Sequence, residues 1–390
     1  YEIGTGDWSS DVCSSDLSFK RSAGIRVIQV VNNIFNKEKK MKKLIVLVAA
    51  MVMIAGYANA AEWNFYGSAR VSTFWTSIET IATPTTADVD NFAQGLQGNS
   101  RVGANVKVSD ELSGRFEAGN SGTTWNTRLI YGEWNFGGGT FLVGQTYTPL
   151  NLFYSNQVFG GDTDLLAYGG VYSGRAPQLR LKFGGFQIAA VAPAAANLLG
   201  AGGLTENKLP TIEAAYSLKM GAVAVKLAGG YNSYENSLGV ANYDIDAYAV
   251  ALGASASFGM IKFGGNIYSG QNSGQLIWTD VNGAFGAADG LPVITGTQVR
   301  DNDVLGYVIV ATAKLNDMFS VEFGYAGIQT ELDAVPGGVP VTDDASSYYA
   351  QAVITLAPGV YVIPEVGVVD YDEIGQTKTT YFGAKWQINF

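Results

Sequence analysis

Apolar and polar side chains alternate with a period of two along the chain from residue 61 to residue 390. In the first segment, one face carries Trp63, Phe65, Gly67, Ala69, Val71, Thr73 and Trp75, and the other carries Asn64, Ser68, Arg70 and Ser72. Successive side chains of a β-strand point to opposite faces of a sheet, so this period predicts strands. The sequence therefore predicts an all-β fold whose sheet has one apolar face.

Sixteen segments share this pattern, and they are joined alternately by short and long connections. The segments lie near residues 63–75, 101–108, 115–118, 127–136, 140–147, 174–183, 186–193, 210–219, 221–231, 244–257, 259–270, 302–315, 318–329, 346–357, 359–371 and 378–390. Half of the connections are tight turns, and the others are long and polar, for example those at 78–98, 148–172, 194–208, 271–300 and 330–345. Short periplasmic turns and long extracellular loops are typical of a transmembrane antiparallel β-barrel.

A soluble β-sandwich or propeller is the main alternative to such a barrel. A sandwich needs a dry core between two apolar faces, whereas here the second face repeatedly carries Arg, Lys, Glu, Asn and Gln. Aromatic residues also gather towards the strand ends, as they do at the two interfaces of a membrane. Both observations favour a 16-stranded barrel with lipid outside and water inside.

The composition excludes several classes of function. The chain contains no histidine, and its only cysteine is Cys13. Ser-His and Cys-His catalytic sites and imidazole metal ligands are therefore impossible, and we expect no enzyme, cofactor or metal site. Eight of the 24 basic and five of the 34 acidic residues precede residue 61, which leaves residues 61–390 with a formal charge of −13. Such an acidic chain is poorly suited to bind nucleic acid.

The first sixty residues divide into two parts. Residues 41–60 have the basic start, short apolar run and Ala58-Asn59-Ala60 triplet of a secretory signal peptide. The apolar run is too short for a transmembrane helix, which needs about 20 residues. Residues 1–40 contain DWSSDVCSSDL, which resembles a translated sequencing adapter, and no Met occurs before Met41. We therefore expect residues 1–40 to be a translation artefact of adapter and untranslated leader, and residues 61–390 to be the barrel.

Several stretches resemble the trimeric general diffusion porins of Gram-negative bacteria. They are FYGSARVSTFW at 65–75, SRVGANVKVSDELSGRFEAG at 100–119, TRLIYGEWNFGGGTFLVGQ at 127–145, PLNLFYSNQVFGGDTDLLAYGG at 149–170 and the terminal TTYFGAKWQINF. The resemblance implies that the third loop, residues 148–172, folds into the barrel and that its carboxylates face wall arginines across a constriction. It also implies a homotrimer in outer-membrane lipid, and a C-terminal strand, with Trp386, Ile388 and Phe390, that the barrel-assembly machinery recognises.

Five charged residues are the candidates for the pore constriction that the resemblance implies. Arg101 and Arg128 match wall arginines of the family, and Arg70 lies two residues after the basic position usual in the first strand. Asp162 matches the loop aspartate that follows two glycines, and Asp164 is its neighbour. Inward charges in a porin wall are more often solvated lumen residues, so the remaining charged wall positions carry no such assignment.

This chain departs from the family pattern at four places. Val158 and Tyr154 stand where many members have loop acids, and no basic residue matches the wall position of the sixth strand near Ala167, although Arg175 and Arg180 follow in the sequence. Arg128 also shares parity with outward-facing aromatic residues, while Glu133 falls on the other face. If Arg128 points inward, Glu133 needs a bulge or a subunit interface, because lipid would not tolerate it.

The sequence thus predicts an outer-membrane porin that passes ions and small hydrophilic solutes by passive diffusion. A substrate-specific channel is one alternative, and a barrel with a blocked lumen that serves as an anchor or adhesin is another. The net negative charge favours cations at the mouth, whereas wall arginines with two loop acids missing favour anions at the narrowest point. The sequence leaves this choice open.

Overall fold

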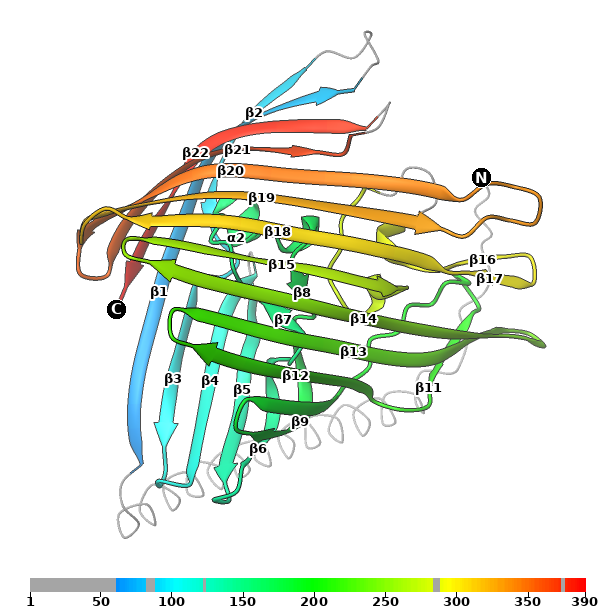
Figure 1. The fold of residues 1–390 in the computed structure, drawn as a ribbon, viewed down its shortest axis with the longest axis horizontal. Helices are drawn as coiled ribbons and strands as arrows, with labels where there is room; N and C mark the ends of the chain where they lie inside the picture. The colour runs from blue at the N-terminus through cyan, green and yellow to red at the C-terminus, as the bar shows by residue number, and fades with distance from the viewer. Residues whose placement is uncertain (1–60, 82–87, 122–123, 283–287, 373–375) are drawn as a thin grey trace, which may run out of the picture. The chain divides into compact units, whose positions relative to one another are not determined.

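The computed structural model describes residues 61–81, 88–121, 124–282, 288–372 and 376–390. The predictions for residues 1–40 and 41–60 fall outside these ranges. From Glu62 onwards the chain forms a closed antiparallel barrel in which strands adjacent in sequence are neighbours in the sheet (Figure 1). Within the described residues, no helix has the length and hydropathy needed to cross a bilayer.

The barrel wall has sixteen strand positions, as the alternation predicts, and two of these positions are each made by two short strands. The wall strands are β1 (Glu62–Thr80), β2 (Val89–Leu96), β3 (Arg101–Lys107), β4 (Leu112–Ser121), β5 (Thr124–Asn135), β6 (Thr140–Tyr147), β9 (Arg175–Phe183), β10 (Phe186–Val191), β11 (Leu204–Asn207), β12 (Thr211–Met220), β13 (Val223–Leu238), β14 (Ala241–Phe258), β15 (Ile261–Gln271), β18 (Asn302–Lys314), β19 (Phe319–Leu332), β20 (Val341–Ala357), β21 (Val360–Asp370) and β22 (Thr377–Asn389). Both β2 and β3 pair with β1, and both β11 and β12 pair with β13. The first and last strands, β1 and β22, pair from Ser68↔Asn389 to Thr80↔Thr377 and close the barrel.

Several strands extend beyond the segments that the sequence predicts. The expected connection at 78–98 contains the end of β1 and all of β2, and the expected loop at 330–345 shrinks to the residues between Leu332 and Val341. Residues 232–243, between two predicted strands, form a hairpin of β13 and β14 instead. The hairpin extension of β13 carries Ser233, Glu235 and Ser237 on its outer face, so the apolar alternation ends there although the backbone hydrogen bonds continue.

Part of the lumen is filled by a buried core. On β14, Tyr248, Val250 and Leu252 point outward and are about half exposed, whereas the inward Ala247 and Ala249 are fully buried. These small side chains leave room for Leu150, Leu152 and Val171 of an inward-folded loop, which pack against them in one cluster. The loop therefore covers one side of the wall, and any open passage must lie along the other side.

Two loops fold into the barrel. The inward loop, residues 148–174, contains β7 (Asn151–Leu152), α2 (Phe159–Asp162), η1 (Leu166–Tyr168) and β8 (Val171–Tyr172). The second inward loop, residues 272–282, begins with η2 (Ser273–Gln275) and donates the Trp278 N–H to the Tyr172 carbonyl at 2.9 Å. After it come η3 (Ala288–Gly290), β16 (Val293–Thr295) and β17 (Gln298–Arg300). We call the end of the barrel where both loops begin the long-loop rim.

Candidate functional site

Three wall carboxylates hold the inward loop against the inside of the barrel. Each accepts backbone N–H groups of the loop and is at most 3% exposed. The bonds are Leu150 N–H to Glu213 Oε2 at 2.8 Å, Asn156 N–H to Glu322 Oε1 at 2.8 Å, Val158 N–H to Glu365 Oε2 at 2.7 Å and Phe159 N–H to Glu365 Oε1 at 3.0 Å. Hydrogen bonds to charged groups contribute about 1.5–3 kcal/mol each. The loop is therefore fixed along its length, from strands β12, β19 and β21.

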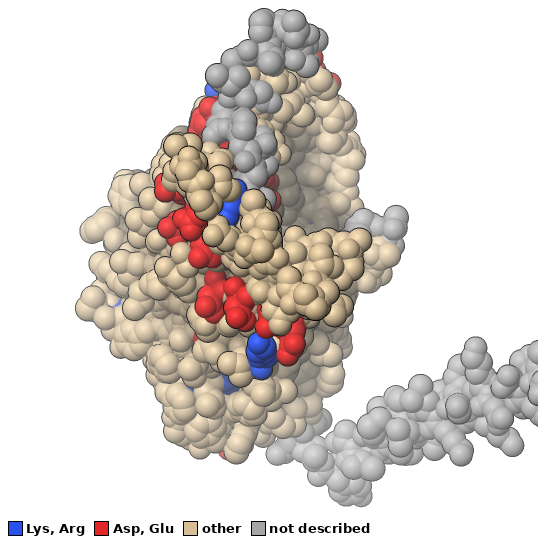
Figure 2. Space-filling view, turned by 90° about the vertical axis from the view of Figure 1, so that its right-hand side faces the viewer, with Lys and Arg blue, Asp and Glu red and all other residues tan. Residues whose placement is uncertain are grey.

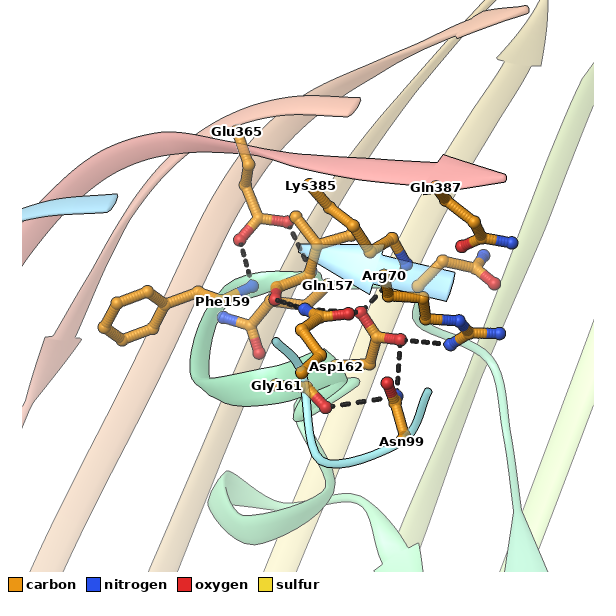
Figure 3. Close-up of polar contacts among 12 residues, drawn as sticks. Arg70, Asn99, Gln157, Phe159, Gly161, Asp162, Glu365, Lys385 and Gln387 are labelled. Carbon is orange, nitrogen blue, oxygen red and sulfur yellow. Dashed lines mark hydrogen bonds and ion pairs between the residues drawn. The ribbon is translucent and has the colours of Figure 1, made fainter. Parts of the chain in front are cut away.

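Asp162 lies at the tip of the inward loop and is bound on several sides by the wall (Figure 3). Its Oδ2 accepts from Arg70 at 2.6 Å and from Asn99 Nδ2 at 2.6 Å, and its Oδ1 accepts from Lys385 Nζ at 2.8 Å. Gly160 and Gly161 precede it with φ of 64° and 83°, values that glycine adopts without strain. The glycine pair thus allows the tight turn that presents this carboxylate to β1 and β22.

An irregularity in the wall supplies the polar partners of Asp162. Ser68 pairs with Arg101 and Val71 pairs with Leu96, so the residues 97–100 lie opposite only two residues of β1. The Ser100 hydroxyl donates to the Arg70 carbonyl at 3.1 Å, which satisfies part of the interrupted ladder. Extra residues in one strand redirect side chains at a bulge. Asn99 is directed in this way towards the loop tip.

The two loop aspartates have pKa values displaced in opposite directions. Burial alone would raise the pKa of Asp162, but the charges of Lys385 and Arg70 outweigh it and hold this pKa below its ordinary value. Burial raises the pKa of Asp164 well above its ordinary value, and the charge of Asp162 raises it further. Asp162 is therefore a stable anion, whereas the charge of Asp164 depends on pH.

A second carboxylate, Glu117 on β4, organises the arginines of the wall. Its Oε1 accepts from Arg128 Nε at 2.6 Å and lies 3.6 Å from Arg101 NH1. Its Oε2 accepts from Arg115 NH2 at 3.1 Å and from the Tyr66 hydroxyl at 2.7 Å. Glu117 is only 2% exposed, so three guanidinium groups share one buried carboxylate and an excess of positive charge remains.

A β-bulge explains how Arg128 and Glu133 can both face the lumen. Glu117 pairs with Leu129 while Ala118 pairs with Thr127, so Arg128 is the unpaired residue of β5. The bulge shifts the parity of the strand, and Glu133 forms an ion pair with Lys182 inside the barrel. Of the two explanations that the sequence left open, a bulge or a subunit interface, the structure has the bulge, and neither Arg128 nor Glu133 has to face lipid.

A cavity of about 540 Å³ separates the inward loop from the wall of β1, β3, β5 and β9. Four arginines line it, one from each of these strands: Arg70, Arg101, Arg128 and Arg175. Two loop carboxylates, Asp162 and Asp164, line the same cavity. All five sequence-predicted residues are thus brought together around one space.

The wall position of the sixth strand that the family resemblance puts near Ala167 does not lie in a strand. Ala167, near which the wall position was expected, lies in η1 of the loop and is fully buried. The sixth wall strand begins at Arg175, which lines the cavity, whereas Arg180 donates to the Tyr147 carbonyl and does not. The strand itself lies where the alternation predicts it, near residues 174–183, and Arg175 stands at its start.

Sequence reasoning also missed the partners that fix the charges. Lys385 was left among the solvated lumen residues, yet it binds Asp162 across 223 positions of sequence. Its parity in the last strand, opposite to Trp386, indicates an inward direction but not a partner. The expected assembly residues Trp386, Ile388 and Phe390 are 49%, 53% and 72% exposed. Among the described residues, no group of three or more acidic or sulfur ligands is placed to hold a metal ion.

Comparisons with known proteins agree with this architecture. A family model described as Gram-negative porin matches residues 47–374. The outer membrane channel DcaP of Acinetobacter baumannii is 16% identical, with 85% of this chain and 97% of that chain covered and a TM-score of 0.67. The trimer form of OmpT of Vibrio cholerae is 18% identical, with 84% of this chain and 99% of that chain covered and a TM-score of 0.52. An anion-selective porin from Comamonas acidovorans is 14% identical, with 85% of this chain and 100% of that chain covered and a TM-score of 0.53. At these identities the similarity to the three solved structures shows a shared fold only. A search of curated protein sequences found no match.

Proposed function

This chain belongs to the Gram-negative porin family, and on that premise we propose that it is a diffusion channel whose narrowest section prefers anions. As a porin it is an integral outer-membrane channel, and its fold and family are those of a channel rather than an enzyme. Diffusion of ions and small hydrophilic solutes requires only a water-filled path and fixed charges along it. The proposal concerns what those charges select.

The balance of charge around the cavity supports the proposed preference for anions. Four arginines line it against two carboxylates, and one of these, Asp162, is already paired with Arg70 and Lys385. Glu117 is 2% exposed, pairs with Arg101 and Arg128 and does not line the cavity. The cavity therefore carries a net positive charge, which attracts anions most strongly where little water screens it.

A band of carboxylates at the long-loop rim favours cations rather than anions. Figure 2 shows acidic side chains gathered on this face with few basic ones. Glu206, Glu235 and Asp244 belong to this end and are register partners on the neighbouring strands β11, β13 and β14. Salt screens exposed charges over about 8 Å at physiological ionic strength, so the rim acts weakly on ions at the cavity. The arginines should therefore decide the selectivity.

Reversal potential under a potassium chloride gradient tests the proposal. We expect stable ohmic openings in a planar bilayer, with a reversal potential whose sign gives a greater permeability for chloride than for potassium. The matched variant Arg101→Gln should shift the potential towards cations, because it removes one partly exposed positive charge. A cation-selective wild type would contradict the anion preference, and a folded barrel that inserts without conducting would contradict the open channel.

Selectivity is also expected to depend on pH through Asp164. Below its raised pKa the Asp164 carboxyl is neutral, and above that pKa it adds a negative charge to the cavity. The preference for chloride should therefore fall as the pH is raised. Reversal potentials of the wild type and of Asp164→Asn across a pH series measure this, and the variant should lack the decline. Equal pH dependence in both proteins would assign the effect to another group.

Assembly and partners form the remaining part of the proposal. OmpT of Vibrio cholerae, which shares the fold, has a trimer form, and a homotrimer is the assembly that we propose here. The outward aromatic residues of β22 face lipid in the proposed orientation, with the long-loop rim outside the cell. Recognition of Trp386, Ile388 and Phe390 by the barrel-assembly machinery remains part of the proposal. Conductance that closes in three equal steps would support the trimer.

A further inference from the structure

Two large aromatic side chains are exposed inside the barrel rather than towards lipid. Phe153, in the inward loop, is 47% exposed, and Trp278, in the second inward loop, is 46% exposed. Both line the cavity that the four arginines share. Apolar surface left in water costs about 25 cal/mol per Å², so such side chains usually find a cover. Neither strand pairing nor contact with lipid accounts for their position.

These two residues belong to a continuous aromatic cluster. Tyr147 and Phe153 have ring centroids 5.3 Å apart, Phe153 and Tyr172 are 6.1 Å apart, and Tyr172 and Trp278 are 6.3 Å apart. All three pairs are edge-on, the arrangement that aromatic rings prefer. The cluster joins the wall, the inward loop and the second inward loop along one side of the cavity.

The backbone and its neighbours hold Trp278 firmly in place. Its N–H donates to the Tyr172 carbonyl at 2.9 Å, and the N–H of Asp280 donates to the Ala167 carbonyl at 3.0 Å. Ile277 beside it is 1% exposed and packs in the lumen core. Because the backbone on which this ring is mounted is already fixed, little backbone freedom is lost when a ligand contacts the ring.

Two arginines stand beside this aromatic cluster with charge available to a ligand. The guanidinium of Arg175 lies 5.2 Å from the centroid of the Tyr147 ring and donates to its hydroxyl at 3.0 Å. The side chain of Arg101 is 20% exposed, compared with 6% for Arg128. Arginine binds carboxylate, sulfonate or phosphate oxygens through paired donors. The cavity therefore offers an anion site next to an aromatic surface.

We propose that this cavity binds solutes in which a carboxylate or sulfonate is attached to an aromatic ring. The ring contacts Phe153, Tyr172 and Trp278, and the anionic group binds Arg101 and Arg175. A volume of about 540 Å³ is ample for such a molecule. The inference rests on the proposed diffusion channel and deepens it by naming a class of solute that dwells in the narrow section.

Block of the chloride current by benzoate tests the inference, with cyclohexanecarboxylate and benzyl alcohol as matched probes. Cyclohexanecarboxylate keeps the charge and bulk but lacks the aromatic face, and benzyl alcohol keeps the ring but lacks the charge. Because an aromatic pair contributes about 0.5–1.5 kcal/mol, we expect benzoate to block half the current at a concentration about threefold to tenfold below that of cyclohexanecarboxylate. Benzyl alcohol should not block.

Variants separate this site from a purely structural cluster. Trp278→Leu and, independently, Phe153→Leu should abolish the preference for benzoate over cyclohexanecarboxylate while chloride still passes. The control Trp134→Leu, on the outward face of β5, should keep it. Equal block by the two carboxylates in the wild type, or an unchanged preference in both loop variants, would overturn the inference. Loss of all conductance in the folded wild type would instead refute the diffusion channel.

Discussion

Replacing Glu365 with glutamine is expected to loosen the inward loop and to raise both the mean conductance and the current noise of the channel. The carboxylate of Glu365 accepts N–H groups from Val158 and Phe159 with separate oxygens. A glutamine has one acceptor oxygen, so its NH₂ group would face a backbone N–H and leave it unpaired in a buried position. The loss should weaken docking of the loop by about 1.5–3 kcal/mol.

Combining this change with Glu322→Gln should enlarge the effect. Glu322 binds both the backbone N–H and the side-chain amide of Asn156, at 2.8 Å each. With both anchors altered, the segment from Asn156 to Phe159 loses charge-assisted bonds to two strands, and excursions of the loop should open the passage more often. Single-channel recording measures the change.

A matched control makes the result specific. Glu133→Gln removes another inward carboxylate that pairs with Lys182 on the wall and has no hydrogen bond to the loop among those described. It should leave conductance and noise near their wild-type values. If the double variant folds, as judged by its circular dichroism, and conducts like the wild type, then the carboxylates do not control the loop.

The barrel could be predicted from the sequence because its two faces meet different solvents. On β14 the outward Tyr248, Val250 and Leu252 alternate with small inward residues, and that contrast reveals a strand without any knowledge of its partners. Beyond the lipid both faces meet water. The strand β2, Val89–Leu96, is exposed along its whole length and shows no such contrast, so it was expected to be loop.

Only those residues of the candidate site that lie in short stretches resembling the family could be predicted from the sequence. Arg101 and Asp162 lie in stretches that resemble the family, and both line the cavity. Trp278 lies in no such stretch, and Lys385 lies in the terminal stretch TTYFGAKWQINF, whose resemblance gives it no role at the constriction. Lys385 meets Asp162 because the last strand closes on the first, and Trp278 reaches the cavity because one loop packs on another. Such long-range contacts leave no local period in the sequence.

Replacing Glu117 with glutamine is expected to increase the preference for anions and to destabilise the barrel. The variant removes one negative charge that Arg101, Arg115 and Arg128 share, so the net positive charge at the cavity wall rises by one. Removing one partner of a buried ion pair costs about 3–5 kcal/mol. Arg101 and Arg115 are 20% and 34% exposed and can turn towards lumen water, so we expect the lower end of that range. Reversal potential and urea unfolding in detergent measure the two effects.

The double variant Glu117→Gln with Arg128→Gln separates charge from packing. It restores the wild-type net charge, so its reversal potential should return close to the wild-type value. It also removes the buried guanidinium that Glu117→Gln leaves unpaired, so its stability should exceed that of Glu117→Gln, and the cycle of single and double variants gives the coupling energy. If Glu117→Gln leaves the reversal potential unchanged, the arginines that pair with Glu117 do not control selectivity. A shift in Glu117→Gln that the double variant fails to reverse would show that Glu117 acts by positioning the arginines rather than through net charge.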